Sequence, residues 1–515
     1  MEVNVRLAGR CGRKVGEKQH KWKQNHQLVF QSRILESVLK RSKPSPAESE
    51  FLFEIDPEPA AERLTSYGGA AVLIRTLRSL GVAQSVARHI HIKKRDRGYD
   101  EATFVESFVV LNGVGGDCLD DFDQLRADAG LTSILGHELP SPGAARNFLY
   151  EFHDESRIDD AKQQCTMLGT KAYIPGENAA LSGLGLVNRE VVQEVGRRCP
   201  EQRIATVDQD ATIIESRKQE ALRGYEGERC YQPMLAVWAE MNLVLADEFR
   251  DGNVPAAYQG LPVAKAAFAS LPSTVNEYYF RGDSACHEHE LIDWLRDENR
   301  RDGPQGFIGF GVSARMSPAL RQAVEAVPEA QWEAYGKHDA EVTRECVDVT
   351  FVPNEHREHK DMQPLRYVAI RIRPRQGGLL NDGTEVKHFA VVSNIRKWNP
   401  ARLLQWHREK AGTIEAVHDV LKNELAAGVL PCGRFGANAA WLRLAVLTYN
   451  TLTALKRLAL PAELLQARPK RLRFLFFNTA GRFVQHARKT ILRLAMSATR
   501  LAEFLSALTL LPVRT

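Results

Sequence analysis

Two carboxylates interrupt a run that otherwise reads as a buried strand. The run begins at Arg203 and ends at Ile214, and β-branched residues dominate it, as a pleated strand favours. Asp208 and Asp210 are two residues apart, so a strand would place both on one face. Burying unpaired carboxylates is costly, so this pair requires a cation. Carboxylate oxygens suit Mg²⁺ or Mn²⁺, and a metal ion is the simplest candidate.

A second interpretation is that the strand ends at Val207 and that the two aspartates begin a turn. In that case both side chains would face water and would need no cation. The residues of this stretch do not decide between the two interpretations. Periodicity also treats Asp208 and Asp210 alike, so the choice of a metal ligand between them stays open.

Charge is concentrated near the two ends of the chain. The 515 residues suggest roughly two to four domains, and 44% hydrophobic with 26% charged residues is ordinary for a globular protein. The net charge is only +5, but the first 43 residues and the segment from Lys456 to Arg500 are rich in Lys and Arg. Basic ends around a near-neutral middle suit contact with a polyanion. The alternative is that these charges only keep the protein in solution.

The cysteine pattern favours a reducing cytoplasm. Eight cysteines are scattered without a CxxC pair or a disulfide framework. No apolar run approaches the roughly 20 residues that span a bilayer, and the basic N-terminus has no apolar signal region. We therefore expect no membrane contact and a cytoplasmic location.

The chain divides into five expected segments. Residues 1–50 read as a basic, flexible arm, and 51–200 as a helical N-terminal domain that could contain a DNA-reading helical hairpin. Helices are expected at 68–77, 99–111 and 141–149. Asp117, Asp120, Asp121 and Asp123 begin a further helix, where the dipole favours acids without a metal.

Residues 201–340 switch to strands alternating with helices. Strands are expected at 203–214, 230–238, 243–249, 277–284 and 306–312, with helices at 255–270 and 287–299. This order predicts an α/β fold with a mixed sheet and flanking helices. Asp283 ends its strand, where open sheets place ligand-binding groups.

A β-rich insertion at 341–398 and a helical, basic part at 399–515 complete the chain. Strands are expected at 347–352, 366–372 and 388–393. Beyond the insertion, Thr413 can cap a helix on which Glu415, His418, Asp419 and Lys422 share one face, whereas Glu424 points elsewhere. An ordinary solvated helix face would have the same pattern.

Taken together, the acids resemble those of a known family, the DDE transposases of bacterial insertion sequences. The matching motifs are, in order, Asp208-Gln209-Asp210-Ala211-Thr212, Arg281-Gly282-Asp283-Ser284, Lys422-Asn423-Glu424-Leu425 and Phe435-Gly436-Ala437-Asn438-Ala439-Ala440-Trp441. The similarity runs from about residue 51 to the C-terminus. Each motif is short, but the ordered set is specific.

The resemblance implies a ribonuclease H-like core with an inserted β-domain, and two Mg²⁺ or Mn²⁺ ions held by Asp210, Asp283 and Glu415. The match to Asp-Ala-Thr favours Asp210, with Asp208 as the rival ligand. Lys422 matches the lysine of the third motif and would contact DNA phosphate. Arg408 and Ala411 stand where the family has Tyr and Arg, so Arg408 or Lys410 could replace the missing phosphate contact.

The implied activity is binding of terminal inverted repeats, followed by metal-dependent DNA cleavage and strand transfer. The expected partners are double-stranded repeat and target DNA, and a second copy of the chain in a homodimeric DNA complex in the bacterial nucleoid. The alternatives are a catalytically inactive DNA-binding protein and a stand-alone nuclease. The basic, apolar-interleaved segment from Arg468 to Lys489 is a further candidate for DNA contact.

Overall fold

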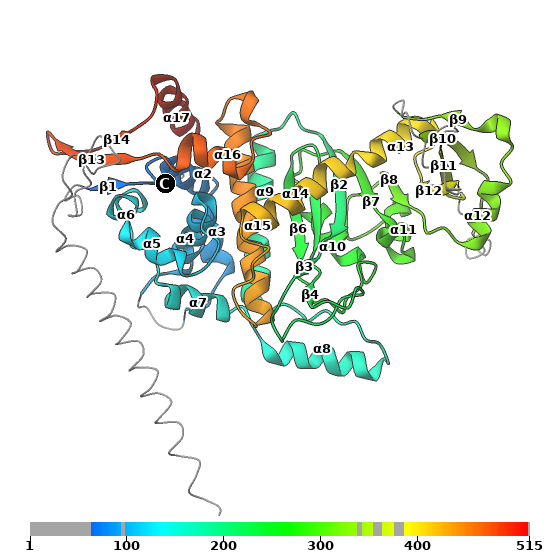
Figure 1. The fold of residues 1–515 in the computed structure, drawn as a ribbon, viewed down its shortest axis with the longest axis horizontal. Coiled ribbons are helices and arrows are strands. Elements are labelled where there is room, and N and C mark those ends of the chain that lie inside the picture. Colours follow the sequence, from blue (N-terminus) through cyan, green and yellow to red (C-terminus); the bar gives the residue numbers. More distant parts are fainter. Residues whose placement is uncertain (1–62, 94–97, 337–341, 354–362, 375–385, 513–515) are drawn as a thin grey trace, which may run out of the picture. The chain divides into compact units, whose positions relative to one another are not determined.

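The computed structural model describes residues 63–93, 98–336, 342–353, 363–374 and 386–512 (Figure 1). The expected basic arm at 1–50 lies outside these residues. Within them, no helix combines the length and the apolar character that crossing a membrane requires.

Helices fill the first part, as the sequence predicts. The Ser141 hydroxyl caps α7 by accepting from the N–H of Ala144, and Asp100 caps α4 by accepting from Thr103. Pro142 follows its cap at the first helical position, where no N–H is needed. The helices are α2 (Ala70–Ser79), α3 (Val82–His89), α4 (Glu101–Val114), α5 (Asp121–Ala127), α6 (Ala129–Leu135), α7 (Pro142–Tyr150), α8 (Glu155–Met167) and α9 (Ala179–Arg197).

A mixed nine-stranded sheet forms the middle of the fold, with the order β6-β5-β2-β7-β8-β12-β11-β10-β9. β2 pairs antiparallel with β5 and parallel with β7, and β7 pairs parallel with β8. The strands are β2 (Ile204–Ala211), β5 (Met234–Trp238), β6 (Leu243–Glu248), β7 (Glu277–Gly282), β8 (Ile308–Ser313), β9 (Glu333–Ala334), β10 (Val342–Val349), β11 (Arg366–Pro374) and β12 (Lys387–Ser393). The predicted class, a mixed sheet with flanking helices, is confirmed.

The inserted strands extend the core sheet. β12 pairs antiparallel with β8, so β9 to β12 continue the same hydrogen-bonded ladder. The strand expected at 230–238 is divided at Pro233 into β4 (Cys230–Tyr231) and β5, and β4 pairs instead with β3 (Ile214–Glu215). The remaining helices here are α10 (Leu261–Ser270), α11 (His289–Arg296), α12 (Pro318–Glu325), α13 (Pro400–Arg408) and α14 (Lys410–Glu424).

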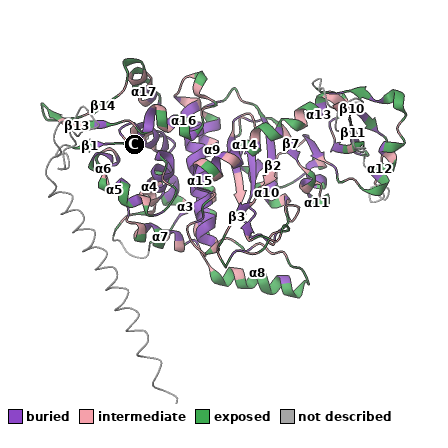
Figure 2. Ribbon diagram, in the orientation of Figure 1, coloured by how far each residue is buried: buried purple, intermediate pink, exposed green. Residues whose placement is uncertain are grey.

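Helix α15 (Phe435–Leu458) joins the N-terminal helices to the sheet. Almost all of it is buried, and it packs on α2, α4, α7, α9 and β6 (Figure 2). The Arg443 guanidinium binds the Asp247 carboxylate of β6 at 3.0 Å, and the Asn450 side chain exchanges two hydrogen bonds with the backbone of Val244. One hydrophobic core therefore runs through both parts.

The C-terminal part contains a β-hairpin that the helical prediction missed. β13 (Gly481–His486) and β14 (Lys489–Leu494) pair antiparallel around a two-residue turn, and β13 also pairs with β1 (Leu64–Thr65). Helices α16 (Pro469–Leu472) and α17 (Ala498–Leu510) flank this hairpin along the chain. The expectation of helices to the C-terminus was therefore wrong for residues 481–494.

Candidate active site

Strand register brings Asp210 and Asp283 together. β2 and β7 are parallel neighbours, with Asp208 opposite Arg281 and Gln209 opposite Gly282. One more step of the same register sets Asp210 level with Asp283, just past the end of β7. Neighbouring strands lie about 4.8 Å apart, and residues level with each other face the same side. The two aspartates therefore form an acidic pair at the ends of adjacent strands.

Asp208 faces the same side but is already paired. Its carboxylate is fully buried and accepts two hydrogen bonds from Arg281, at 2.6 and 2.9 Å. The Thr413 hydroxyl donates a further hydrogen bond to it. Arg281 also donates to the Trp406 carbonyl at 2.6 Å and lies over the Trp406 ring. This buried network fastens β2 and β7 to helices α13 and α14.

Asp210 is half-buried and pairs with a lysine. Lys410, the first residue of α14, donates from Nζ to Oδ2 of Asp210 at 2.8 Å. Burial alone would lower the pKa of Lys410, but the carboxylates of Asp210 and Asp283 outweigh it and raise the pKa. Lys410 is therefore a charged ammonium that interacts electrostatically with both Asp210 and Asp283.

Asp283 caps a short turn and has neutral neighbours. Its carboxylate accepts a hydrogen bond from the N–H of Ala285, the second residue of the 3-10 turn Ser284–Cys286. Burial, reinforced by Asp283, raises the pKa of the Cys286 thiol. Burial also lowers the pKa of His407 to about 4, and its Nε2 lies 3.1 Å from the Gly282 carbonyl. Lys410 is thus a cation that interacts with both carboxylates, at 2.8 Å from Asp210.

Glu415, the third expected acid, lies on α14 five residues after Lys410. Its side chain is exposed and makes no hydrogen bond or ion pair with the described residues. The ligand atoms of Asp210, Asp283 and Glu415 do not all lie within 4.8 Å of one another in the described part of the chain. The strand register therefore aligns Asp210 with Asp283, but the three acids do not form one group within that distance.

The other residues predicted on this helix have distinct surroundings. Lys422 donates from Nζ to the Thr212 hydroxyl at 3.0 Å, beside the end of β2. Exposed Arg408 hydrogen-bonds Tyr335. His418 is buried without a hydrogen-bond partner in the described residues, and burial with nearby Lys422 and Lys410 lowers its pKa to about 3. Glu424 pairs with Arg468, which also binds Asp419.

Thr413 does not cap the helix. α14 begins three residues earlier, at Lys410, and the Thr413 hydroxyl donates to Asp208 instead. Sequence reasoning also missed the partner of Asp208. A signal was present, because Arg281 precedes Asp283 by the same two residues that separate Asp208 from Asp210. In parallel neighbouring strands, that shared spacing predicts an ion pair beside an acidic pair.

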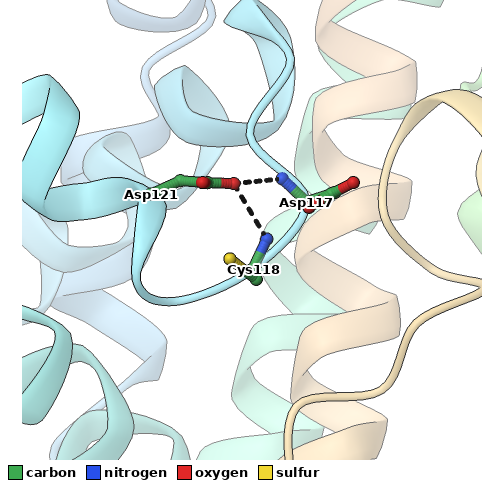
Figure 3. Close-up of side chains that lie close together, drawn as sticks. All are labelled: Asp117, Cys118 and Asp121. Carbon is green, nitrogen blue, oxygen red and sulfur yellow. Dashed lines mark hydrogen bonds between the residues drawn. The ribbon is translucent and has the colours of Figure 1, made fainter.

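A second acidic cluster is formed by Asp117, Cys118 and Asp121 (Figure 3). The Asp121 carboxylate accepts from the backbone N–H groups of Asp117 and Cys118, at 2.8 and 3.1 Å. Burial raises the pKa of the Cys118 thiol, which keeps it protonated. These bonds fix the turn before α5, and the ligand atoms of the three side chains lie within 4.8 Å of one another.

The basic C-terminal segment separates into paired and exposed cations. Arg468 pairs with Asp419 and Glu424, and Arg473 donates to the carbonyls of Asn112, Gly113 and Glu424. In contrast, residues 485–491 at the hairpin tip are all exposed, including Arg488 and Lys489. No Asp or Glu occurs between Glu463 and Glu503. The hairpin, together with exposed Lys470 and Arg471, is therefore open to an anionic partner.

Comparison with known proteins places the chain among the transposases. Residues 54–514 match the family described as transposase DDE domain group 1, and the chain belongs to that family. No curated protein matches. A solved synaptic complex of piggyBac transposase with hairpin DNA shares 10% identity over 78% of each chain, with a TM-score of 0.43, a likeness that carries no argument on function. The nine-stranded mixed sheet with its flanking helices agrees with the predicted α/β fold class.

Proposed function

We propose that this transposase binds terminal inverted repeats and catalyses metal-dependent DNA cleavage and strand transfer. The observation that carries the proposal is the alignment of Asp210 and Asp283 at the ends of β2 and β7, beneath the helix that carries Glu415. Such transposases cut and join by one chemistry, an in-line displacement at phosphorus with water or a 3′-hydroxyl as the nucleophile.

The donor set fits two Mg²⁺ or Mn²⁺ ions. Asp210 and Asp283 already share a cationic neighbour, and Glu415 is exposed without a described partner. Because two bridged metals lie about 4 Å apart, their ligands need not all lie as close together as those of a single ion. When bound, the metals would activate the nucleophile and stabilise the leaving oxygen. Asp208 does not fit, because Arg281 and Thr413 occupy its oxygens.

The remaining residues of the site would position the acids and the DNA. Arg281, through Asp208, holds β2, β7 and the start of α14 together, so it would fix the acidic pair. Lys422, beside the exit of β2, and exposed Arg408 would contact phosphate. Arg488 and Lys489 of the hairpin would supply additional affinity without regard to sequence, because phosphate contacts carry little sequence information.

An assay of purified protein with element-end DNA and Mg²⁺ tests the proposal. Cleavage at the repeat ends and joining of the 3′ ends to target DNA are the expected results. Hydrolysis without joining would indicate a nuclease, and specific binding without cleavage would indicate a DNA-binding protein that has lost catalysis. Analytical ultracentrifugation of the DNA complex tests the expected homodimer, and imaging of a tagged protein in bacterial cells tests the nucleoid location.

A further inference from the structure

Lys410 occupies an unusual position for a cation. It is the first residue of α14, where the helix dipole disfavours positive charge, and only 8% of its surface is exposed. A buried ammonium requires compensation by anions. Asp210 supplies it at 2.8 Å, and Asp283 adds a second negative charge nearby.

Other cations around the site are not available for this compensation. Arg281 is held by Asp208 and the Trp406 carbonyl, and Lys422 donates to the Thr212 hydroxyl and the Ile213 carbonyl. His407 and His418 are neutral because burial lowers both pKa values. Within the described residues, Lys410 is therefore the side chain that balances the charge of the acidic pair.

We propose that the Lys410 ammonium substitutes for the divalent cation at Asp210 in the metal-free protein and has to leave when the metal binds. This inference rests on the proposed function, since it concerns the same acidic pair. One oxygen of Asp210 cannot satisfy an ammonium and a divalent ion together, because the two cations repel at that distance. The pair therefore keeps the acids in place before metal binding and weakens metal affinity. Once displaced, Lys410 would be free to reach the DNA backbone.

Substitution K410M tests the exchange, because Met keeps the unbranched apolar stem and removes the charge. We expect K410M to bind Mn²⁺ about tenfold more tightly than the wild type, the equivalent of about 1.4 kcal/mol, in a titration followed by electron paramagnetic resonance of free Mn²⁺. We also expect its melting temperature without metal to fall and to recover on adding Mn²⁺, because the metal then compensates the acids.

Substitution K265M is the matched control. It removes a lysine of α10 that also pairs with an aspartate, Asp302 at 2.6 Å, but that belongs to no part of the proposed site, so its Mn²⁺ affinity should equal that of the wild type. K410R keeps the charge and should bind Mn²⁺ no more tightly than the wild type. Equal or weaker Mn²⁺ binding by K410M would overturn the exchange while leaving the metal site intact. Absence of Mn²⁺ binding in wild type and K410M alike would overturn the metal site, and with it the proposed function.

Discussion

The cations of the active site and those of the C-terminal hairpin are placed in opposite environments. Arg281 and Lys410, the inner cations, are buried and bound to Asp208 and Asp210. Arg488 and Lys489, the outer cations, are exposed in an acid-free stretch of chain. A buried cation without an anion is costly, whereas an exposed one is hydrated and available. The inner cations therefore stabilise the site, whereas the outer ones are available for a ligand.

The hairpin also places two cations beside each other, because Arg482 is the register partner of Arg493 across the strand pair. Like charges directly opposite each other destabilise a strand pair. The turn adds strain, because Ala487 and Arg488 have φ values of 47° and 65°, a conformation that favours Asn and Gly. A cationic residue therefore stands at a turn position whose backbone conformation favours Asn or Gly.

The largest expected effect is on chemistry at the inner site. D283N should lower the cleavage rate by more than about a hundredfold. Substituting a residue that only hydrogen-bonds to a metal ligand already lowers metal affinity or activity by about 10- to 100-fold, and Asp283 is a proposed ligand itself. Binding to element-end DNA should persist, because the outer cations are unchanged. Cleavage and gel-shift assays on the same preparation measure both. D117N is the control. The hydrogen bond that holds this turn is accepted by the carboxylate of Asp121 and not by that of Asp117, so D117N should cleave DNA at the wild-type rate. Nicking by D283N at the wild-type rate would remove Asp283 from the site.

Removing an inner cation should strongly destabilise the fold. R281M leaves the fully buried Asp208 carboxylate without its charged partner, so we expect a loss of about 3–5 kcal/mol of unfolding free energy. Urea unfolding followed by circular dichroism measures it. The outer substitution R488M should change stability by less than about 0.5 kcal/mol. Adding D208N to R281M should recover part of the loss, and no recovery would show that the ion pair is not the cause.

Removing outer cations should act on DNA binding alone. R488M/K489M should reduce the slope of log affinity against log salt by about two units, because each phosphate contact contributes about 0.9. R468M removes a charge that Asp419 and Glu424 already pair, so its slope should stay near that of the wild type. Equal slopes for all three proteins would show that the hairpin is only solvated. Point substitutions are preferable to removing the basic C-terminal segment, because that segment includes Phe476 and Phe477, which are fully buried in the core, and their loss would destabilise the fold.

The smallest expected effect concerns the hairpin turn. A487G relieves a positive φ without changing charge, so the hairpin should gain less than about 1 kcal/mol. Native-state hydrogen exchange of the β13 and β14 amides measures this local stability. T490G, in the strand itself, should have the opposite sign because glycine weakens a strand interior. An unchanged exchange rate in A487G would mean that the turn is not strained.

Local patterns predicted the elements of the site but not their partners. Residue patterns indicated strands at 203–214 and 277–284 and placed Asp283 at a strand end, whereas the family resemblance was needed to favour Asp210 over Asp208. The Asp208–Arg281 pair depends on the register between strands that are about 70 residues apart in the chain, which no local pattern encodes. Lys410 was assigned to phosphate as a replacement for the family's missing contact, and its partner Asp210 lies 200 residues away in the chain, where no local pattern could indicate the pair. The hairpin was missed because Ala487-Arg488 is not a hairpin turn signal.

The late position of α15 in the chain has a consequence for synthesis. Its packing partners α2, α4 and α7 leave the ribosome first, and roughly 340 residues separate the end of α4 from the end of α15. At about 5–20 residues per second, the early helices wait roughly 20–70 s for the helix that covers them. During that interval their apolar faces depend on chaperones, and a nascent chain that stops before Phe435 is expected to aggregate rather than to leave a stable fragment.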